Sequence, residues 1–261
     1  MKLTLLGGGR MGEALLGGLL AAKWAEPTEL AVVEKLPARR DELVRLFPGV
    51  TVLDAPDETD GAVVAVKPGD VAGACTDLAA AGVGMVLSIA AGVTIAALES
   101  ALGAGVPVVR AMPNTPALVG AGAAAIAPGS SATDEHLAWA ESILGAVGTV
   151  TRVPEAALDA VTGLSGSGPA YVFLVAEALI EAGVLVGLPR DVSSALATQT
   201  LLGSARLLAE SGELPEVLRA QVTSPGGTTA AGLRVLESAG LRAAFVEAVA
   251  AATERSRELG A

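Results

Sequence analysis

The sequence has little of several residue types, and each shortage excludes a class of site or partner. Only one cysteine, Cys75, occurs among 261 residues, so no internal disulfide can form. The single histidine, His136, lies in a segment typical of an exposed acidic helix start, and no Cys or His cluster predicts a metal site. Because 17 basic residues are set against 28 acidic ones, the net charge of −11 would repel a phosphate backbone, and we expect no nucleic-acid partner.

Targeting and membrane signals are also missing. The first residues, MKLTLLGGG, lack the charged, apolar and cleavable regions of a signal peptide, which together with the lone cysteine predicts a cytoplasmic protein. Residues 81–98 carry no charge and are long enough for a membrane span. Because glycines interrupt them and no basic or aromatic flanks are present, we expect a buried strand, a turn and a helix start, and no membrane partner.

Short apolar segments alternate with helical ones through the first half of the chain. Aromatic residues make up 2% of the sequence and hydrophobic residues 52%, so the core has to consist of Ala, Val, Leu and Ile. Continuous apolar strands separated by helices are typical of a parallel sheet covered on both faces. The predicted strands are residues 2–6, 30–33, 50–53, 62–66, 85–89 and 106–111, with additional edge strands at 122–127 and 149–153.

The pattern changes near residue 153 to long helical segments, predicted at residues 155–162, 169–181, 189–210, 214–221 and from 228 to the end. We therefore predict an α/β protein with a Rossmann-type, doubly wound, mostly parallel sheet in residues 1–153, followed by an all-α helical domain for substrate binding and dimerisation in residues 154–261. The helix from Pro169 is apolar nearly all round and requires burial on every side. A second copy of the chain or a monomeric helical bundle provides such burial, and both interpretations stay open.

A glycine motif, GGGRMG, joins the first predicted strand to the first helix. Gly7 allows a tight turn, Gly9 lets the backbone approach a pyrophosphate, and Gly12 lets the helix pack close to the sheet. We therefore predict a nicotinamide dinucleotide site at a loop that also includes Arg10 and Met11.

Charged residues after the second strand bear on which dinucleotide binds. Glu34 stands where a carboxylate can bind the ribose 2′-hydroxyl, which favours NAD. Lys35, Arg39 and Arg40 favour NADP if they hold a 2′-phosphate; otherwise they are solvated charges on a helix. The residues alone leave the choice between NAD and NADP open.

Two further segments lie at the predicted carboxyl edge of the sheet, where doubly wound sheets bind ligands. Ala65, Val66, Lys67 and Pro68 close the fourth strand, and we expect them to contact the cofactor. Asn114 follows the sixth strand between two prolines, where its amide can hold the nicotinamide or an ordered water, or can simply form a turn.

Two clusters of glycine and hydroxyl residues, at 164–171 and 223–229, each precede a predicted helix. Free backbone N–H groups, a helix dipole and hydroxyls together favour a substrate carboxylate, although Ser and Thr also serve as ordinary helix caps. We favour the binding role for the second cluster, TSPGGTT. No lysine follows Lys67, so the helical half has no catalytic lysine, and a substrate that arrives already protonated fits better.

The chain closely resembles the Δ1-pyrroline-5-carboxylate reductase family in motifs that span its length. They are GGGRMGEALLGGLL near the start, AVKP at residues 65–68, RAMPNTP at 110–116, DAVTGLSGSGPAY at 159–171 and VTSPGGTT at 222–229. The resemblance implies an oxidoreductase that transfers a hydride from NADPH or NADH to the C=N bond of 1-pyrroline-5-carboxylate and forms L-proline, the last step of proline biosynthesis. An imine nitrogen is basic enough to enter protonated, so it needs only to be positioned near the hydride donor.

The resemblance also implies roles for single residues. Thr229 would hydrogen-bond the ring nitrogen as the catalytic residue. The substrate would be bound by Ser224, Gly226, Gly227 and Thr228, with Glu155 and Thr162 nearby, and the cofactor would be approached by Ala90, Ala91 and Gly92. The family favours NADP(H), whereas NAD(H) remains an alternative because this chain has Glu34 and Lys35 where many relatives have Ser, Asn or Arg.

Self-association is the last implication of the resemblance. The helical domains would interlock into a homodimer whose site is shared between chains, and larger rings of dimers occur in the family. Two other interpretations stay open: a related imine or keto-acid reductase of the same two-domain plan, and a dinucleotide-sensing dimer without turnover. The sensing dimer would leave the TSPGGTT cluster without a ligand.

Overall fold

The computed structural model describes residues 1–260, and the chain forms two compact units. The sheet unit comprises Met1–Ser167 together with residues 250–260, and the helical unit comprises Gly168–Val249. Residues 154–167 pack with the sheet because Leu158 is buried in a cluster with Ile95 and Ala125. The compact units thus divide later than the predicted boundary at residue 153, and the assignment of domains 1–153 and 154–261 stays a prediction.

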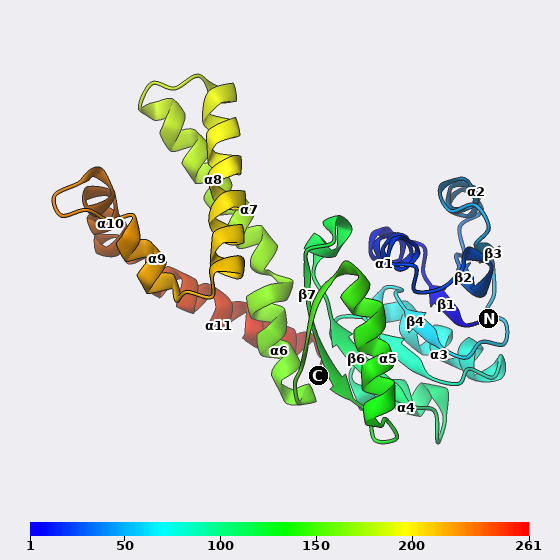
Figure 1. Ribbon diagram of the computed structural model, residues 1–261. Coiled ribbons are helices and arrows are strands. Elements are labelled where there is room, and N and C mark those ends of the chain that lie inside the picture. The colour runs from blue at the N-terminus through cyan, green and yellow to red at the C-terminus, as the bar shows by residue number, and fades with distance from the viewer. Residues whose placement is uncertain (261) are drawn as a thin grey trace. The chain divides into compact units, whose positions relative to one another are not determined.

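The sheet unit contains one eight-stranded sheet with the order β3-β2-β1-β4-β5-β6-β7-β8 (Figure 1). The strands are β1 (Leu3–Leu6), β2 (Leu30–Val33), β3 (Thr51–Leu53), β4 (Ala62–Val64), β5 (Val86–Ser88), β6 (Val108–Met112), β7 (Gly122–Pro128) and β8 (Gly148–Arg152). All neighbouring strands are parallel except β6 and β7. The predicted doubly wound, mostly parallel sheet is confirmed. Of the two predicted additional edge strands, only β8 lies at an edge, because β7 pairs on both sides.

Helices cover both faces of the sheet because successive strand residues point to opposite sides. Leu3 and Leu5 of β1 belong to the apolar layer that packs against α1 (Arg10–Ala21), α2 (Pro37–Leu46) and α5 (Asp134–Leu144). Leu6 belongs to the opposite layer, which packs against α3 (Val71–Ala80) and α4 (Ile95–Leu102). Burial on both faces explains why the strands are continuously apolar in the sequence.

The segment after β8 is helical but irregular. A 3₁₀ turn (Glu155–Ala157) leads into α6 (Leu158–Val161) and then into a π-helical turn (Thr162–Gly166). The N–H of Ser167 donates to the carbonyl of Thr162 at 2.8 Å, which is the i→i+5 spacing of a π-helix. Residues 155–162 are helical as predicted, but the helix is not regular. The Thr162 hydroxyl donates to the Leu158 carbonyl at 2.8 Å and competes with the regular backbone ladder.

The helical unit contains α7 (Gly168–Leu185), α8 (Arg190–Ser211), α9 (Pro215–Gln221), α10 (Thr228–Ser238) and the first part of α11 (Leu241–Gly260). The prediction of one helix from residue 228 to the end is wrong, because Gly240 adopts φ +76° between α10 and α11. Helices α7 and α8 approach closely, and the Ser193 hydroxyl donates to the Ile180 carbonyl at 2.8 Å. As its composition predicts, α7 is apolar, and none of its residues is fully buried within the chain.

Candidate functional site

The glycine turn after β1 is closely packed on the protein side and open on the other. Gly7 has φ +107°, a conformation that favours glycine. A side chain at Gly7 would lie 2.6 Å from the carbonyl oxygen of Ala65, and one at Gly12 would overlap the carbonyl of Gly7. By contrast, no atom lies within 4 Å of the position that a Gly9 side chain would take. The backbone at Gly9 is therefore accessible to a ligand.

The amino terminus of α1 provides hydrogen-bond donors at this opening. Gly9 is the N-cap residue, no side chain caps the helix, and the N–H of Glu13 donates to the Gly9 carbonyl at 2.8 Å. The N–H groups of the first turn precede that bond and have no partner within the helix, and the positive end of the helix dipole lies with them. The residues present thus fit a pyrophosphate. Arg10 is exposed here, whereas Met11 packs against the core.

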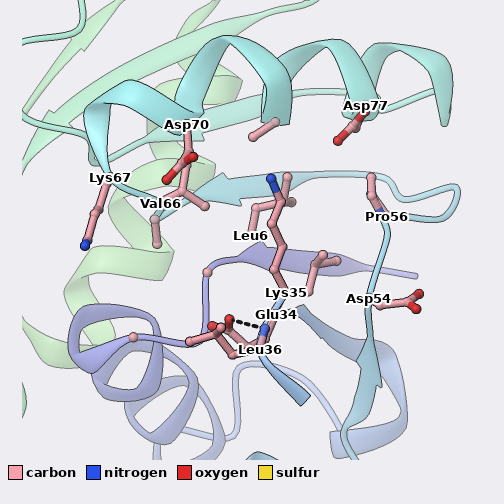
Figure 2. A pocket seen from close by; sticks show the side chains of 15 residues that line it. Leu6, Glu34, Lys35, Leu36, Asp54, Pro56, Val66, Lys67, Asp70 and Asp77 are labelled. Atoms are coloured by element: carbon pink, nitrogen blue, oxygen red, sulfur yellow. Dashed lines mark hydrogen bonds between the residues drawn. The ribbon is translucent and has the colours of Figure 1, made fainter. Parts of the chain in front are cut away.

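A cavity of about 350 Å³ opens beside the glycine turn and brings together seven of the predicted cofactor residues. Figure 2 shows its lining, which consists of Leu6, Gly7, Gly9, Val33, Glu34, Lys35, Leu36, Asp54, Pro56, Ala65, Val66, Lys67, Asp70, Ala74 and Asp77. We call it the dinucleotide cavity. Asp54, Asp70 and Asp77 were not among the predicted residues. The position of Asp54 directly after β3 was a usable signal, because strand ends of a doubly wound sheet meet at this edge.

Charged side chains around β2 are already engaged with the protein. The Glu34 carboxylate accepts hydrogen bonds from the N–H groups of Gly8 at 3.1 Å and Leu36 at 2.9 Å. Arg39 forms ion pairs with Glu13 and Glu42, and their carboxylates raise the pKa of its guanidinium, Glu13 having the larger effect. These contacts fix the charges at the end of β2.

Arg40 is engaged in the same region through backbone carbonyls. Its guanidinium donates to the carbonyls of Glu34 at 2.8 Å and Lys35 at 3.0 Å. Arg40 therefore stabilises the loop that follows β2, whereas Arg39 connects α2 to the glycine turn and to α1.

A second cavity of about 360 Å³ lies within the sheet unit and is lined by Pro68, Ala91, Gly92, Thr162, Ser167, Ala252, Arg255, Ser256 and Leu259. It brings the predicted cofactor residues Pro68, Ala91 and Gly92 together with Thr162, a predicted substrate residue, while Ala90 is buried just before them. No sequence motif marks the residues of α11. The Ser256 hydroxyl donates to the Asp159 carboxylate at 2.7 Å and so fixes α11 against the segment that carries Thr162.

Glu155 and Asn114 line neither cavity and instead hold residues 155–165 against the sheet. One oxygen of Glu155 accepts from the Arg110 guanidinium at 2.8 Å and from the N–H of Ile95, at the start of α4, at 2.7 Å. The Asn114 amide donates to the Ser165 carbonyl at 3.0 Å and accepts from the N–H of Ala123 at 2.8 Å. Their predicted ligand contacts remain predictions.

The TSPGGTT cluster forms a turn and the start of α10 in the helical unit. Gly226 has φ +70°, and the N–H of Gly227 donates to the Ser224 carbonyl at 3.0 Å. Gly227 is the N-cap of α10 without a side-chain cap, so Thr228 and Thr229 lie in a first turn whose N–H groups lack partners within the helix. The structure thus brings all five predicted residues of this cluster together at a helix amino terminus.

Metal and thiol chemistry find no support in residues 1–260. Among these residues no group of three or more His, Cys, Asp or Glu side chains is placed to hold a metal ion. Cys75 is buried, and burial raises the pKa of its thiol to about 11, so the thiol stays protonated at neutral pH. His136 caps α5, its Nδ1 accepting from the N–H of Thr133 at 2.9 Å.

Two family models match successive parts of the chain. Residues 2–92 match a family described as NADP oxidoreductase, coenzyme F420-dependent, and residues 155–259 match one described as pyrroline-5-carboxylate reductase dimerisation. The second match includes the apolar stretch Glu155–Leu185, which by length and composition alone is sufficient to cross a membrane. A dimerisation domain gives that apolar surface a protein partner and supports self-association of the chain.

Whole-chain relatives carry the same name as the second family model. The chain is 47% identical to the pyrroline-5-carboxylate reductase of Mycobacterium tuberculosis over 99% of this chain and 96% of the relative. It is also 47% identical to that of Synechocystis sp. over 100% of this chain and 98% of the relative.

Solved structures agree with the sequence relatives. The reductase of Coxiella burnetii superposes with a TM-score of 0.93 at 37% identity, covering 100% of this chain and 98% of that one. The Plasmodium falciparum pyrroline carboxylate reductase, solved with NADP bound, superposes with a TM-score of 0.85 at 30% identity, covering 100% of this chain and 98% of that one.

Proposed function

The chain belongs to the pyrroline-5-carboxylate reductase family, and on that basis we propose which of its residues bind the cofactor and which bind the substrate. It is an NAD(P)H-dependent oxidoreductase that reduces the C=N bond of 1-pyrroline-5-carboxylate to give L-proline, the last step of proline biosynthesis. The dinucleotide supplies the hydride when it is bound. The observation that carries the proposal is the open, uncapped amino terminus of α1 beside the dinucleotide cavity.

The cofactor is held along the carboxyl edge of the sheet. Gly7, Gly9 and Gly12 bring the backbone and the α1 terminus to the pyrophosphate, with Arg10 and Met11 in the same turn. Ala65, Val66 and Lys67 line the dinucleotide cavity, which receives the adenosine half. Pro68, Ala91 and Gly92 line the second cavity with Thr162, so we assign that cavity to the nicotinamide end. Ala90, which is buried just before Ala91, supports this loop. Asn114 holds Ser165 in the π-helical turn that also contains Thr162.

The substrate is oriented by the TSPGGTT cluster. The protonated ring nitrogen donates its hydrogen bond to the Thr229 hydroxyl, which positions the C=N bond and keeps the proton on nitrogen. The carboxylate is bound by the Ser224 hydroxyl and by backbone N–H groups of the first turn of α10. The remaining residues of this proposed substrate site are Gly226, Gly227, Thr228, Thr162 and Glu155.

We propose a cytoplasmic homodimer formed through the helical domain, with each site shared between the two chains. The exposed apolar residues of α7 and the dimerisation family match support this assembly. Larger rings, where they form, would be built from the same dimer. The acidic net charge of −11 argues against a nucleic-acid partner, and an apolar surface used for dimerisation needs no membrane.

The choice between the two dinucleotides belongs to this proposal as well. Family resemblance favours NADP(H), and the Plasmodium falciparum relative holds NADP. Glu34 favours NAD(H).

The first experiment follows the oxidation of NADPH, and separately of NADH, with purified protein and 1-pyrroline-5-carboxylate, while proline is quantified. We expect cofactor consumption matched by proline. Consumption without proline would favour a related imine or keto-acid substrate, and cofactor binding without consumption would favour the sensing dimer.

The role of Thr229 is tested by Thr229→Val, which keeps the shape of the side chain and removes its hydroxyl. We expect kcat to fall by about 100-fold or more, with dinucleotide affinity unchanged, because the hydroxyl orients only the substrate. Thr28→Val, at an exposed threonine in the turn before β2, is the matched control and should leave kcat unchanged. Unchanged turnover in Thr229→Val would remove Thr229 from the mechanism.

A further inference from the structure

The charges that line the dinucleotide cavity bear on which dinucleotide this chain accepts. Its ionisable residues are four carboxylates and two amines: Glu34, Asp54, Asp70, Asp77, Lys35 and Lys67 (Figure 2). In a doubly wound sheet the adenosine ribose lies against the end of β2, so its 2′-position faces this group. The cavity is therefore net negative where a 2′-phosphate would add further negative charge.

Glu34 is fixed in the position that contacts the ribose. Each oxygen of its carboxylate accepts one backbone N–H, Oε2 from Gly8 and Oε1 from Leu36, and the second bond is drawn in Figure 2. The carboxylate therefore cannot turn aside without losing both hydrogen bonds. Its remaining lone pairs can accept hydrogen bonds from ribose hydroxyls, whereas a phosphate at the same point offers oxygens and no donor.

The two nearby arginines are not free to offset the charge of this carboxylate. Arg39 is held by Glu13 and Glu42 and also donates to the Gly8 carbonyl at 2.7 Å. Arg40 is held by the carbonyls of Glu34 and Lys35. Binding a 2′-phosphate with either arginine would first break these contacts. Lys35, an exposed side chain that lines the cavity, is the remaining cation next to Glu34.

We infer that this chain selects NAD(H) over NADP(H), and that the backbone-held carboxylate of Glu34 determines the preference. The inference rests on the proposed use of the dinucleotide cavity for the adenosine half and reverses the preference that family resemblance suggests. A second negative charge close to a fixed carboxylate is unfavourable, and the guanidinium groups of Arg39 and Arg40, which could neutralise it, are already hydrogen-bonded within the protein.

The test uses two ligands that differ only in the 2′-phosphate. ADP-ribose and 2′-phospho-ADP-ribose contain no nicotinamide, so their binding, measured by isothermal titration calorimetry on the full chain, is independent of imine reduction. We expect the wild-type protein to bind ADP-ribose at least about tenfold more tightly. Equal or tighter binding of 2′-phospho-ADP-ribose would overturn the inference, even if the protein reduces 1-pyrroline-5-carboxylate.

The variant Glu34→Ser tests whether Glu34 causes the preference for ADP-ribose. It removes the carboxylate and frees the N–H groups of Gly8 and Leu36 for a phosphate beside Lys35, so we expect the affinity ratio to approach or pass one. Glu34→Gln keeps the side-chain length and removes the charge together with one of the two acceptor oxygens, and it should lower the ratio even if the serine variant is unstable. Asp41→Ser, at an exposed carboxylate on α2, should keep the wild-type ratio. A ratio unchanged in both Glu34 variants would overturn the assignment.

The same variants in the reductase assay give an independent readout. The ratio of kcat/KM for NADH to that for NADPH should follow the two affinities, falling in the Glu34 variants and not in Asp41→Ser. Failure of turnover with every cofactor, together with a clear preference for ADP-ribose, would contradict the proposed function and leave this inference intact.

Discussion

The sheet unit and the helical unit bury their apolar residues in different ways. In the sheet unit, strands and helices enclose two apolar layers, and side chains such as Leu16 and Leu87 are completely buried. Among the described residues of the helical unit only Ser193 and Ala197 are buried, while Phe173 is 61% and Leu174 is 65% exposed. The core of the sheet unit is thus completed by one chain, whereas the apolar surface of the helical unit requires another protein surface. The sheet unit therefore contains the apolar core of the single chain, and the helical unit contains the apolar surface for association.

The largest expected effect comes from placing a charge on the apolar surface of α7. Phe173→Glu should raise the dimer dissociation constant by about 100-fold or more, because a buried unpaired carboxylate is costly at an interface. Sedimentation velocity over a range of protein concentrations measures the change. Leu46→Glu, at a 47% exposed position on α2, is the control and should sediment as wild type. If Phe173→Glu also stays dimeric, α7 does not form the interface.

Truncating one leucine in each unit should have a smaller effect and tests whether the two units are stabilised differently. Leu87→Ala, in the fully buried centre of the sheet, should lower the free energy of unfolding by about 2–5 kcal/mol at every protein concentration. Leu174→Ala should destabilise the protein only through the dimer, so its loss should depend on concentration. Denaturant titrations at two concentrations separate the two. A concentration-independent loss in Leu174→Ala would show that the helical unit has a core of its own.

The smallest effects come from one exposed ion pair in each unit. Arg152 lowers the pKa of Glu141 in the sheet unit, and Arg242 lowers the pKa of Glu237 in the helical unit, in each case mainly through a hydrogen bond. A carboxyl group whose pKa is lowered in the folded state stabilises the fold at pH values above its ordinary pKa of about 4.3. This stabilisation is lost as the pH falls through the lowered pKa. Arg152→Gln and Arg242→Gln should therefore lower Tm slightly at pH 7 and hardly at all in acid.

Salt provides the control for both pairs. Because these residues are exposed, high ionic strength should abolish the difference in Tm between wild type and either variant. A difference that persists in high salt would mean that the arginine contributes through packing and not through charge.

The fold of the sheet unit was predictable because its local signals agree with one another. Continuous apolar strands, the glycine turn and the spacing to Glu34 all indicate the same βαβ unit, and the structure places them so. The break at Gly240 was harder to predict, since an isolated glycine within an apolar helical pattern is compatible with either a continuous helix or a cap. The π-helical turn at Thr162–Gly166 depends on hydroxyl contacts that periodicity does not reveal.

The candidate site was predictable to the extent that it lies in contiguous motifs. The glycine turn and TSPGGTT each form a turn and a helix amino terminus within one segment, and three residues of AVKP line the dinucleotide cavity. Residues contributed by distant elements were missed, because neither Asp77 on α3 nor Ser256 on α11 has a sequence neighbour that marks it. The partners of the charged residues around Glu34 could not be predicted either, since the sequence shows Arg39 and Arg40 but not the groups that already hold them.

The return of residues 250–260 to the sheet unit has a consequence for how the protein is made. The ribosome releases nearly all of the sheet unit first and then the whole helical unit, but the residues of α11 that line the second cavity emerge only after both. A nascent chain that stalls before residue 250 lacks Ala252, Arg255 and Ser256, and therefore lacks one wall of that cavity. Such a fragment can form the glycine turn and the strands of the sheet while having an incomplete second cavity.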